Sequence, residues 1–218
     1  MEPGTEPNLS LNSARRPRPQ PTPFAAAEVR AAWLSPAQLL GLVLSAPERL
    51  GANVESGSGL FGLASVMLFA GSVFAVPYGL VHGLDAWWRI IALYVGSTLI
   101  CLPSLHVFTS YLGVALRPTQ VAVLALTIPS VAALFTFGFA PILGFLRATM
   151  DPNSDLVDWR QTSTALLSLA LLAGVLQMIR CLVAAESLNA RRRLYGVLVV
   201  WLVAFGHVLL RMGRLLEL

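Results

Sequence analysis

Five long apolar segments fill the chain from about residue 60 onward and limit its fold more than any other feature. We place these segments at about 60–82, 90–113, 119–146, 163–185 and 194–213. A helix rises about 1.5 Å per residue, and the hydrocarbon core of a bilayer is about 30 Å thick, so segments of roughly 20 apolar residues are long enough to cross it. The sequence therefore predicts an all-α, polytopic membrane bundle of five transmembrane helices, which occupies residues 60–218.

The composition supports a location in the membrane. Hydrophobic residues make up 56% of the chain, charged residues only 12%, and the mean hydropathy is +0.71. The formal net charge is +4, but the arginines lie at the ends of the apolar segments and in the first residues, which favours an anionic membrane surface over a nucleic acid. We therefore expect a lipid bilayer as partner and no nucleic acid. Cys101 and Cys181 lie in different segments at different expected depths, which predicts that they form no disulfide.

Three shorter regions precede the first span. Residues 1–32 are rich in proline and arginine and predict a disordered cytoplasmic tail, which is retained because no apolar segment follows the start as a secretory leader requires. Residues 33–50 predict an amphipathic helix in the membrane interface, where Ser35 can cap the helix and Pro36 suits its first position. The same helix packed on the inner end of the bundle is the alternative. Residues 51–59 read as a polar linker.

The arginines also suggest an orientation. If the amino terminus is cytoplasmic, Arg117 and the arginines at 191–193 lie on the same side as the basic tail. The opposite side then receives the carboxyl terminus and the remaining charged residues of the span ends and connectors, which are Asp85, Arg89, Arg147, Asp151, Asp155, Asp158, Arg160, Arg211, Arg214 and Glu217. Because short cytoplasmic loops carry an excess of arginine and lysine, the triple arginine and the basic tail favour a cytoplasmic amino terminus and an outside carboxyl terminus.

Polar and small residues recur along one face of two spans. The face on the second span comprises Tyr94, Ser97, Cys101, Ser104, Phe108 and Tyr111, and the face on the fourth comprises Ser163, Ala170, Gly174, Gln177, Cys181 and Ala184. Small residues let helices approach closely and hydroxyl groups bond across the contact, so both faces predict helix packing. A polar lining for a conduit is the alternative reading.

Prolines and glycines add bends and close approaches to this picture. Pro103 and three other prolines, Pro77, Pro129 and Pro141, lie in or near the spans, and they predict kinks that serve either packing or a substrate site. Gly79 and Gly83 are four residues apart, a spacing typical of close helix approach.

The candidate chemical groups are few. His82 and Asp85 share a face if the helix continues past them, which would make them a pH-sensitive pair or two metal ligands. No third ligand follows from spacing, so a histidine bonded to backbone or water is the stronger interpretation. No acidic residue lies at the centre of a span, as proton relays and aspartyl proteolysis require. We therefore expect no catalytic residue, no metal and no cofactor.

Between about residues 39 and 182 the chain resembles bacterial members of the Yip-domain (Ypt-interacting-protein-like) family. The matching motifs are Ala46-Pro47-Glu48-Arg49, Tyr78-Gly79 with Gly83, Leu102-Pro103-Ser104-Leu105-His106-Val107-Phe108 with Leu112-Gly113, and Ala140-Pro141-Ile142-Leu143-Gly144-Phe145. The resemblance implies five spans after a cytoplasmic amino terminus, in a bacterial inner membrane. Eukaryotic relatives resemble adaptors for small GTPases, but their cytoplasmic acidic-Leu-Tyr-Gly-Pro signature is absent here, so GTPase binding does not carry over.

Together these features predict a non-catalytic, Yip-like integral membrane scaffold or accessory subunit. Its amino-terminal region would recruit a membrane or cytosolic protein, and its small-residue faces would hold the bundle or a homo-oligomer together. The alternative is a channel or transporter component for a neutral or lipid-like solute, which moves past the proline-containing spans.

Overall fold

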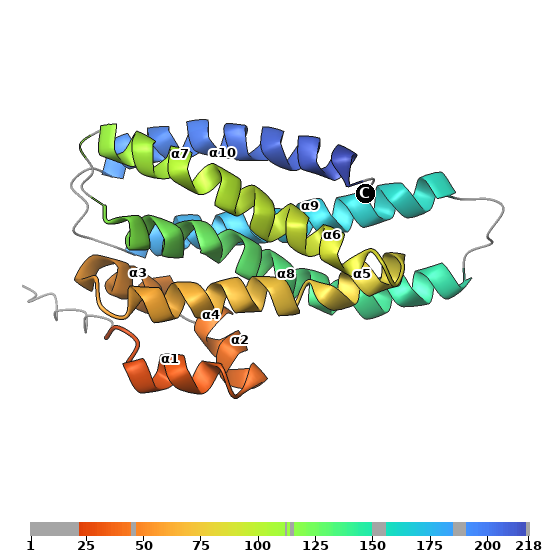
Figure 1. Ribbon diagram of the computed structural model, residues 1–218, viewed down its shortest axis with the longest axis horizontal. Helices are drawn as coiled ribbons and strands as arrows, with labels where there is room; N and C mark the ends of the chain where they lie inside the picture. Colours follow the sequence, from red (N-terminus) through yellow and green to blue (C-terminus); the bar gives the residue numbers. More distant parts are fainter. Residues whose placement is uncertain are drawn as a thin grey trace, which may run out of the picture.

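The computed structural model describes residues 22–44, 47–111, 113, 116–149, 156–184 and 191–216. These residues form helices joined by turns and short connections, and they include no strand. The long helices run side by side along one axis, and the short amino-terminal helices lie at one end and on one side of them (Figure 1). The helices are α1 (Ala26–Ala32), α2 (Pro36–Leu44), α3 (Pro47–Ser56), α4 (Leu60–Val73), α5 (Val76–His82), α6 (Trp87–Ile91), the π-helical turn η1 (Ala92–Gly96), α7 (Ser97–Tyr111), α8 (Pro118–Thr149), α9 (Leu156–Ala184) and α10 (Arg191–Leu215).

Five stretches are long and apolar enough to cross a membrane. They run over Leu60–His82, Trp87–Tyr111, Pro118–Thr149, Gln161–Ala184 and Tyr195–Leu215. The prediction of an all-α bundle with five membrane-spanning helices is confirmed, and the chain is a multi-pass membrane protein.

Helix α8 forms the centre of the bundle. In its most apolar window 78% of the residues are buried, and it packs against both α4 and α9. Small and hydroxyl residues allow this close packing. The Ser130 hydroxyl lies 2.6 Å from the Leu126 carbonyl of α8 itself and 2.9 Å from the Met67 carbonyl of α4. Helix α10 is the opposite case, with only 22% of its window buried, and it packs mainly against α7.

The prolines affect the spans in different ways. Pro77 cannot donate a backbone hydrogen bond, and the first span is divided at Phe74–Ala75 into α4 and α5. Pro103 lies inside α7, and Pro129 and Pro141 lie inside the continuous 32-residue helix α8.

The amino-terminal region differs from the prediction. Helix α1 lies within the segment predicted to be disordered, and residues 33–50 do not form one helix, because α2 ends at Leu44 and α3 begins at Pro47. The predicted linker at 51–59 is helical as far as Ser56. Long-range contacts explain the difference: the Asn53 Oδ1 accepts the Phe24 backbone N–H at 2.6 Å, and the Arg49 guanidinium lies 4.2 Å from the centre of the Phe24 ring. The predicted tail at residues 1–21 lies outside the described residues.

Candidate functional site

A polar cluster joins the end of the first span to the start of the fourth. The Tyr78 hydroxyl lies 2.9 Å from the Ser163 carbonyl oxygen and 3.1 Å from the Ser163 Oγ. The His82 Nε2 lies 2.7 Å from the same Oγ. Tyr78 and Ser163 are buried and His82 is half-buried, so the three side chains form a largely desolvated contact between α5 and α9.

The hydrogen bonds assign a role to each ring nitrogen of His82. Its Nδ1 lies 3.0 Å from the Tyr78 carbonyl, an acceptor only, so Nδ1 carries the proton of the neutral ring and donates it. Nε2 then accepts the Ser163 hydroxyl proton. The ring of Trp159 covers the histidine with its centroid 5.5 Å away, and the Arg147 guanidinium of α8 donates to the Val81 carbonyl beside it. This arrangement ties α5, α8 and α9 together at one end of the bundle.

Asp85 does not join this cluster. Helix α5 ends at His82, and Gly83 follows with a φ of +153°, a backbone conformation that residues other than glycine rarely adopt. The helical face on which His82 and Asp85 were predicted to meet therefore does not exist, and Asp85 is exposed. Within the described part of the chain, no group of three or more His, Cys, Asp or Glu side chains is placed to hold a metal ion.

Two glycines lie where neighbouring backbones approach most closely. A Cβ on Gly174 of α9 would overlap the Ile128 carbonyl oxygen of α8, and a Cβ on Gly79 of α5 would overlap the Trp87 backbone of α6. At both positions the added atom would meet backbone, which cannot move aside as a side chain can. These two glycines therefore set the distance between their helices. A Cβ on Gly83 would meet open space.

The polar face of the fourth span is buried along most of its length. Ser163, Ala170, Gly174, Gln177 and Cys181 are buried, and Ala184 is half-buried. The Gln177 side-chain amide lies 3.4 Å from the Leu44 carbonyl at the end of α2. This face thus contacts both the central helix α8 and the amino-terminal helices.

The polar face of the second span is only partly buried. Tyr94, Ser97 and Cys101 are buried, but Ser104 is half-buried, and Phe108 and Tyr111 are exposed. Helix α7 instead buries a stripe that continues from Cys101 through Leu105 to Thr109. The π-helical turn η1, just before Ser97, widens the helix by one residue per turn. This turn changes the register between the residues before Ala92 and those after Gly96, and it leaves the register within α7 unchanged.

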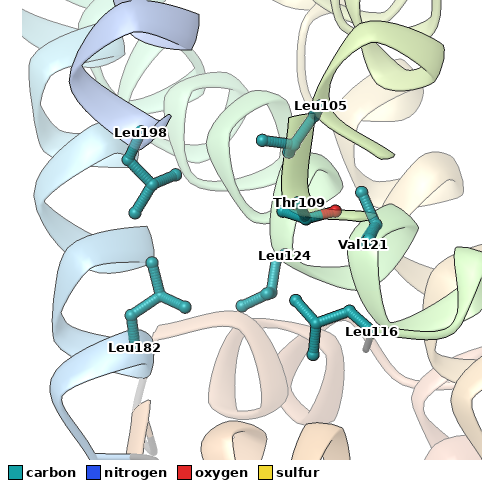
Figure 2. A pocket seen from close by; sticks show the side chains of 7 residues that line it. All are labelled: Leu105, Thr109, Leu116, Val121, Leu124, Leu182 and Leu198. Atoms are coloured by element: carbon teal, nitrogen blue, oxygen red, sulfur yellow. The ribbon is translucent and has the colours of Figure 1, made fainter. Parts of the chain in front are cut away.

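Further along the same span, α7 approaches α8, α9 and α10 around a small apolar cavity (Figure 2). Its volume is about 10 Å³, enough for about one water molecule. The lining side chains are Leu105, Thr109, Leu116, Val121, Leu124, Leu182 and Leu198. A space of this size cannot hold a solute larger than about one water molecule.

Helix α3 packs against α9 and α8, and two amide side chains, Asn53 and Gln120, bond it to neighbouring segments. Asn53, only 1% exposed, accepts the Phe24 N–H and donates from Nδ2 to the Ser58 carbonyl at 3.2 Å. The Gln120 Nε2 at the start of α8 donates to the Val54 carbonyl at 2.5 Å. The other face of α3 exposes Glu48, Glu55 and Ser56. Sequence reasoning missed Asn53 and Gln120, because a polar residue in a predicted linker or at a span end is normally assigned to water.

These features define a helical multi-pass membrane protein with a docked amino-terminal unit. No protein-family model matches the chain, and comparisons with curated proteins and with solved structures found no match either.

Proposed function

We propose that the chain is a non-catalytic integral membrane scaffold or accessory subunit whose helix α3 contacts a membrane or cytosolic protein. One observation carries this proposal. Gln120 bonds α3 to the start of α8 and Asn53 bonds it to the Phe24 backbone, while the charged outer face of α3 stays exposed. A surface that is rigid before binding loses little conformational entropy when a partner docks.

The interior of the bundle supports the same proposal. Its closest contacts are backbone to backbone at Gly79 and Gly174, and the histidine at the end of α5 is engaged in bonds between helices. The transporter alternative would use the proline-containing spans, but Pro103 is exposed on the outside of α7, and the cavity beside that helix holds about 10 Å³. We therefore favour the scaffold over the transporter. The resemblance to the Yip-domain family stays a prediction.

A matched pair of charge reversals tests the scaffold. Glu55 on α3 and Asp85, three residues after α5, are both exposed acidic residues. Helices α3 and α5 lie toward opposite ends of the bundle (Figure 1). We expect Glu55→Arg to remove cross-linked partners from native membranes and Asp85→Arg to leave them. Cross-linking profiles that are the same for both variants and for the wild-type chain would contradict a partner site on α3.

The same two positions test the orientation that we propose, a bacterial inner membrane protein with a cytoplasmic amino terminus and an outside carboxyl terminus. Cysteines at 55 and 85 are labelled in intact cells with a maleimide that does not cross membranes. The native cysteines are both buried, so the wild-type chain serves as the labelling blank. We expect labelling at position 85 and protection at position 55, and the reverse pattern would overturn the orientation.

A further inference from the structure

Helices α1 and α2 form a hairpin that lies along the side of the bundle. Helix α1 runs beside α4, and the chain then turns at Trp33–Ser35 and returns as α2 (Figure 1). Val29 of α1 lies against Gly62 near the start of α4, and the Trp33 ring lies 4.9 Å from the Phe69 ring further along the same helix. The hairpin thus advances along the direction of the spans.

These contacts fix the depth of the hairpin. Phe69 follows Leu60 by nine residues, so the turn lies about 13 Å from the start of the first span at 1.5 Å per residue. At the end of α2, the Leu44 carbonyl lies near the Gln177 side chain of α9. Gln177 precedes the last residue of α9 by seven residues, which corresponds to about 10 Å at 1.5 Å per residue. Because a hydrocarbon core is about 30 Å thick, the turn reaches nearly halfway through it.

The chemistry of the turn suits lipid. Leu34 at its tip is 87% exposed and Trp33 is 45% exposed, which favours hydrocarbon over water around them. The backbone N–H groups of Trp33, Leu34 and Ser35 all donate to carbonyls of Arg30 or Ala31. Backbone at membrane depth needs such internal partners, because hydrocarbon offers none.

A groove of about 460 Å³ lies between the arms and the start of α3. One wall is formed by Phe24, just before α1, and by Ala27, Glu28 and Ala31 on one face of α1. The other residues of the groove are Gln38, Gly41, Leu42 and Arg49. The volume lies in the range of small-molecule sites, about 300–1,000 Å³. Ala27, Ala31 and Leu42 make the inner part apolar, while Arg49 and Glu28 pair at the end nearest α3.

We propose that this groove binds an anionic phospholipid, with an acyl chain between α1 and α2 and its phosphate at the end nearest Arg49. The depth of the hairpin places the apolar part among acyl chains and the charged part near headgroups. Arg49 lines the groove and pairs with Glu28, and Arg30 is a second, exposed arginine on α1 outside the lining. A positive charge near the membrane surface attracts anionic headgroups.

Native mass spectrometry of the purified, delipidated full-length chain tests this site with phosphatidylglycerol and phosphatidylcholine of identical acyl chains. We expect one phosphatidylglycerol to be retained per chain in preference to phosphatidylcholine. Ala31→Trp, which fills the groove, should weaken this binding by at least about tenfold. Ala37→Trp is the matched control, since Ala37 is exposed on α2 and does not line the groove.

The proposal would be overturned if the wild-type chain did not prefer phosphatidylglycerol to phosphatidylcholine. It would also be overturned if Ala31→Trp and Ala37→Trp bound phosphatidylglycerol equally well. If Ala31→Trp fails to fold, Ala27→Trp replaces it. In addition, a phosphatidylglycerol with a diazirine in its acyl chain should cross-link the wild-type protein at residues of α1 or α2, and cross-links confined to other helices would overturn the site. No protein partner is present, so the result is independent of the scaffold proposal.

Discussion

The His82 Nε2 and the Ser163 Oγ lie 2.7 Å apart, although 81 residues separate them in the chain. Their hydrogen bond connects the first span to the fourth, and the Tyr78 hydroxyl reinforces it. Buried polar groups need such partners, because an unpaired one loses its bonds to water without replacement.

A comparison of two serines measures the value of this bond. Ser163→Ala should lower the free energy of unfolding in detergent by about 1 kcal/mol, because it leaves the His82 Nε2 without the hydroxyl that donates to it. Ser97→Ala should leave stability unchanged or raise it, since the buried Ser97 Oγ has no hydrogen-bond partner among the described residues. The midpoint of SDS-induced unfolding reports both changes. An equal loss in the two variants would show that the His82–Ser163 bond adds nothing specific.

Gly174→Ala should separate α8 from α9. The new Cβ meets the backbone of Ile128, and overpacking of this kind typically costs about 1–3 kcal/mol. Gly138→Ala in α8 is the control: its Cβ meets open space, and alanine gains about 0.5–1 kcal/mol over glycine within a helix. SDS-induced unfolding of the two variants should therefore shift in opposite directions. A neutral Gly174→Ala would mean that the two helices can move apart without cost.

Trp201→Phe should loosen α10. The buried Trp201 indole donates to the Cys101 carbonyl at 2.9 Å, and α10 has few other anchors because most of its apolar surface faces outward. We expect the free energy that holds α10 against the bundle to fall by about 1 kcal/mol. Hydrogen–deuterium exchange should then be faster in α10 and unchanged in the other helices. Trp88→Phe, at a half-exposed site on α6, should leave exchange in α10 unchanged. Unchanged exchange in Trp201→Phe would assign the attachment to apolar packing alone.

Acid should release α1 from α3. The hydrogen bond from the Ala25 backbone and then that from Arg49 lower the pKa of the Glu28 carboxyl below its ordinary value of 4.5. A carboxyl whose pKa is lower in the folded than in the unfolded chain stabilises the folded state at pH values above the unfolded pKa. This stabilisation is lost as the pH falls through the lowered pKa of the folded state. Spin labels at the exposed positions 34 and 61 should give a narrow distance distribution at pH 7 that broadens only below pH 4.5.

In Glu28→Gln the same distance distribution should be broad at neutral pH and independent of pH. A distribution that stays narrow in this variant would show that Asn53 and the apolar contacts alone hold α1 in place.

The two polar faces show where sequence periodicity succeeds and where it does not. On the fourth span, Ala170, Gly174 and Cys181 are all buried, because α9 is a regular helix and the 3.6-residue period continues through it. On the second span the buried positions of α7 are spaced by four residues, from Cys101 to Leu105 and Thr109, so Ser104 and Phe108 lie outside the buried stripe. Which side of α7 is covered depends on the neighbouring helices, which the residue pattern of one helix does not specify.

The amino-terminal helices show a different limit. Residues 22–56 contain local helix signals such as Pro36 and Pro47 at first helical positions, but their packing depends on Asn53, Arg49 and Gln177, which act over long sequence separations. From composition alone, part of this region was therefore predicted to be a disordered tail and a linker.

By itself the sequence determined the location and class of this protein, because the length and apolarity of a span are local properties that the bilayer selects directly. The tertiary structure decided which polar groups meet: it joined His82 to Ser163, set Asp85 apart, and placed α1 and α2 beside the bundle. Those outcomes depend on helix ends and on backbone contacts at glycine, which are fixed only when the helices pack together.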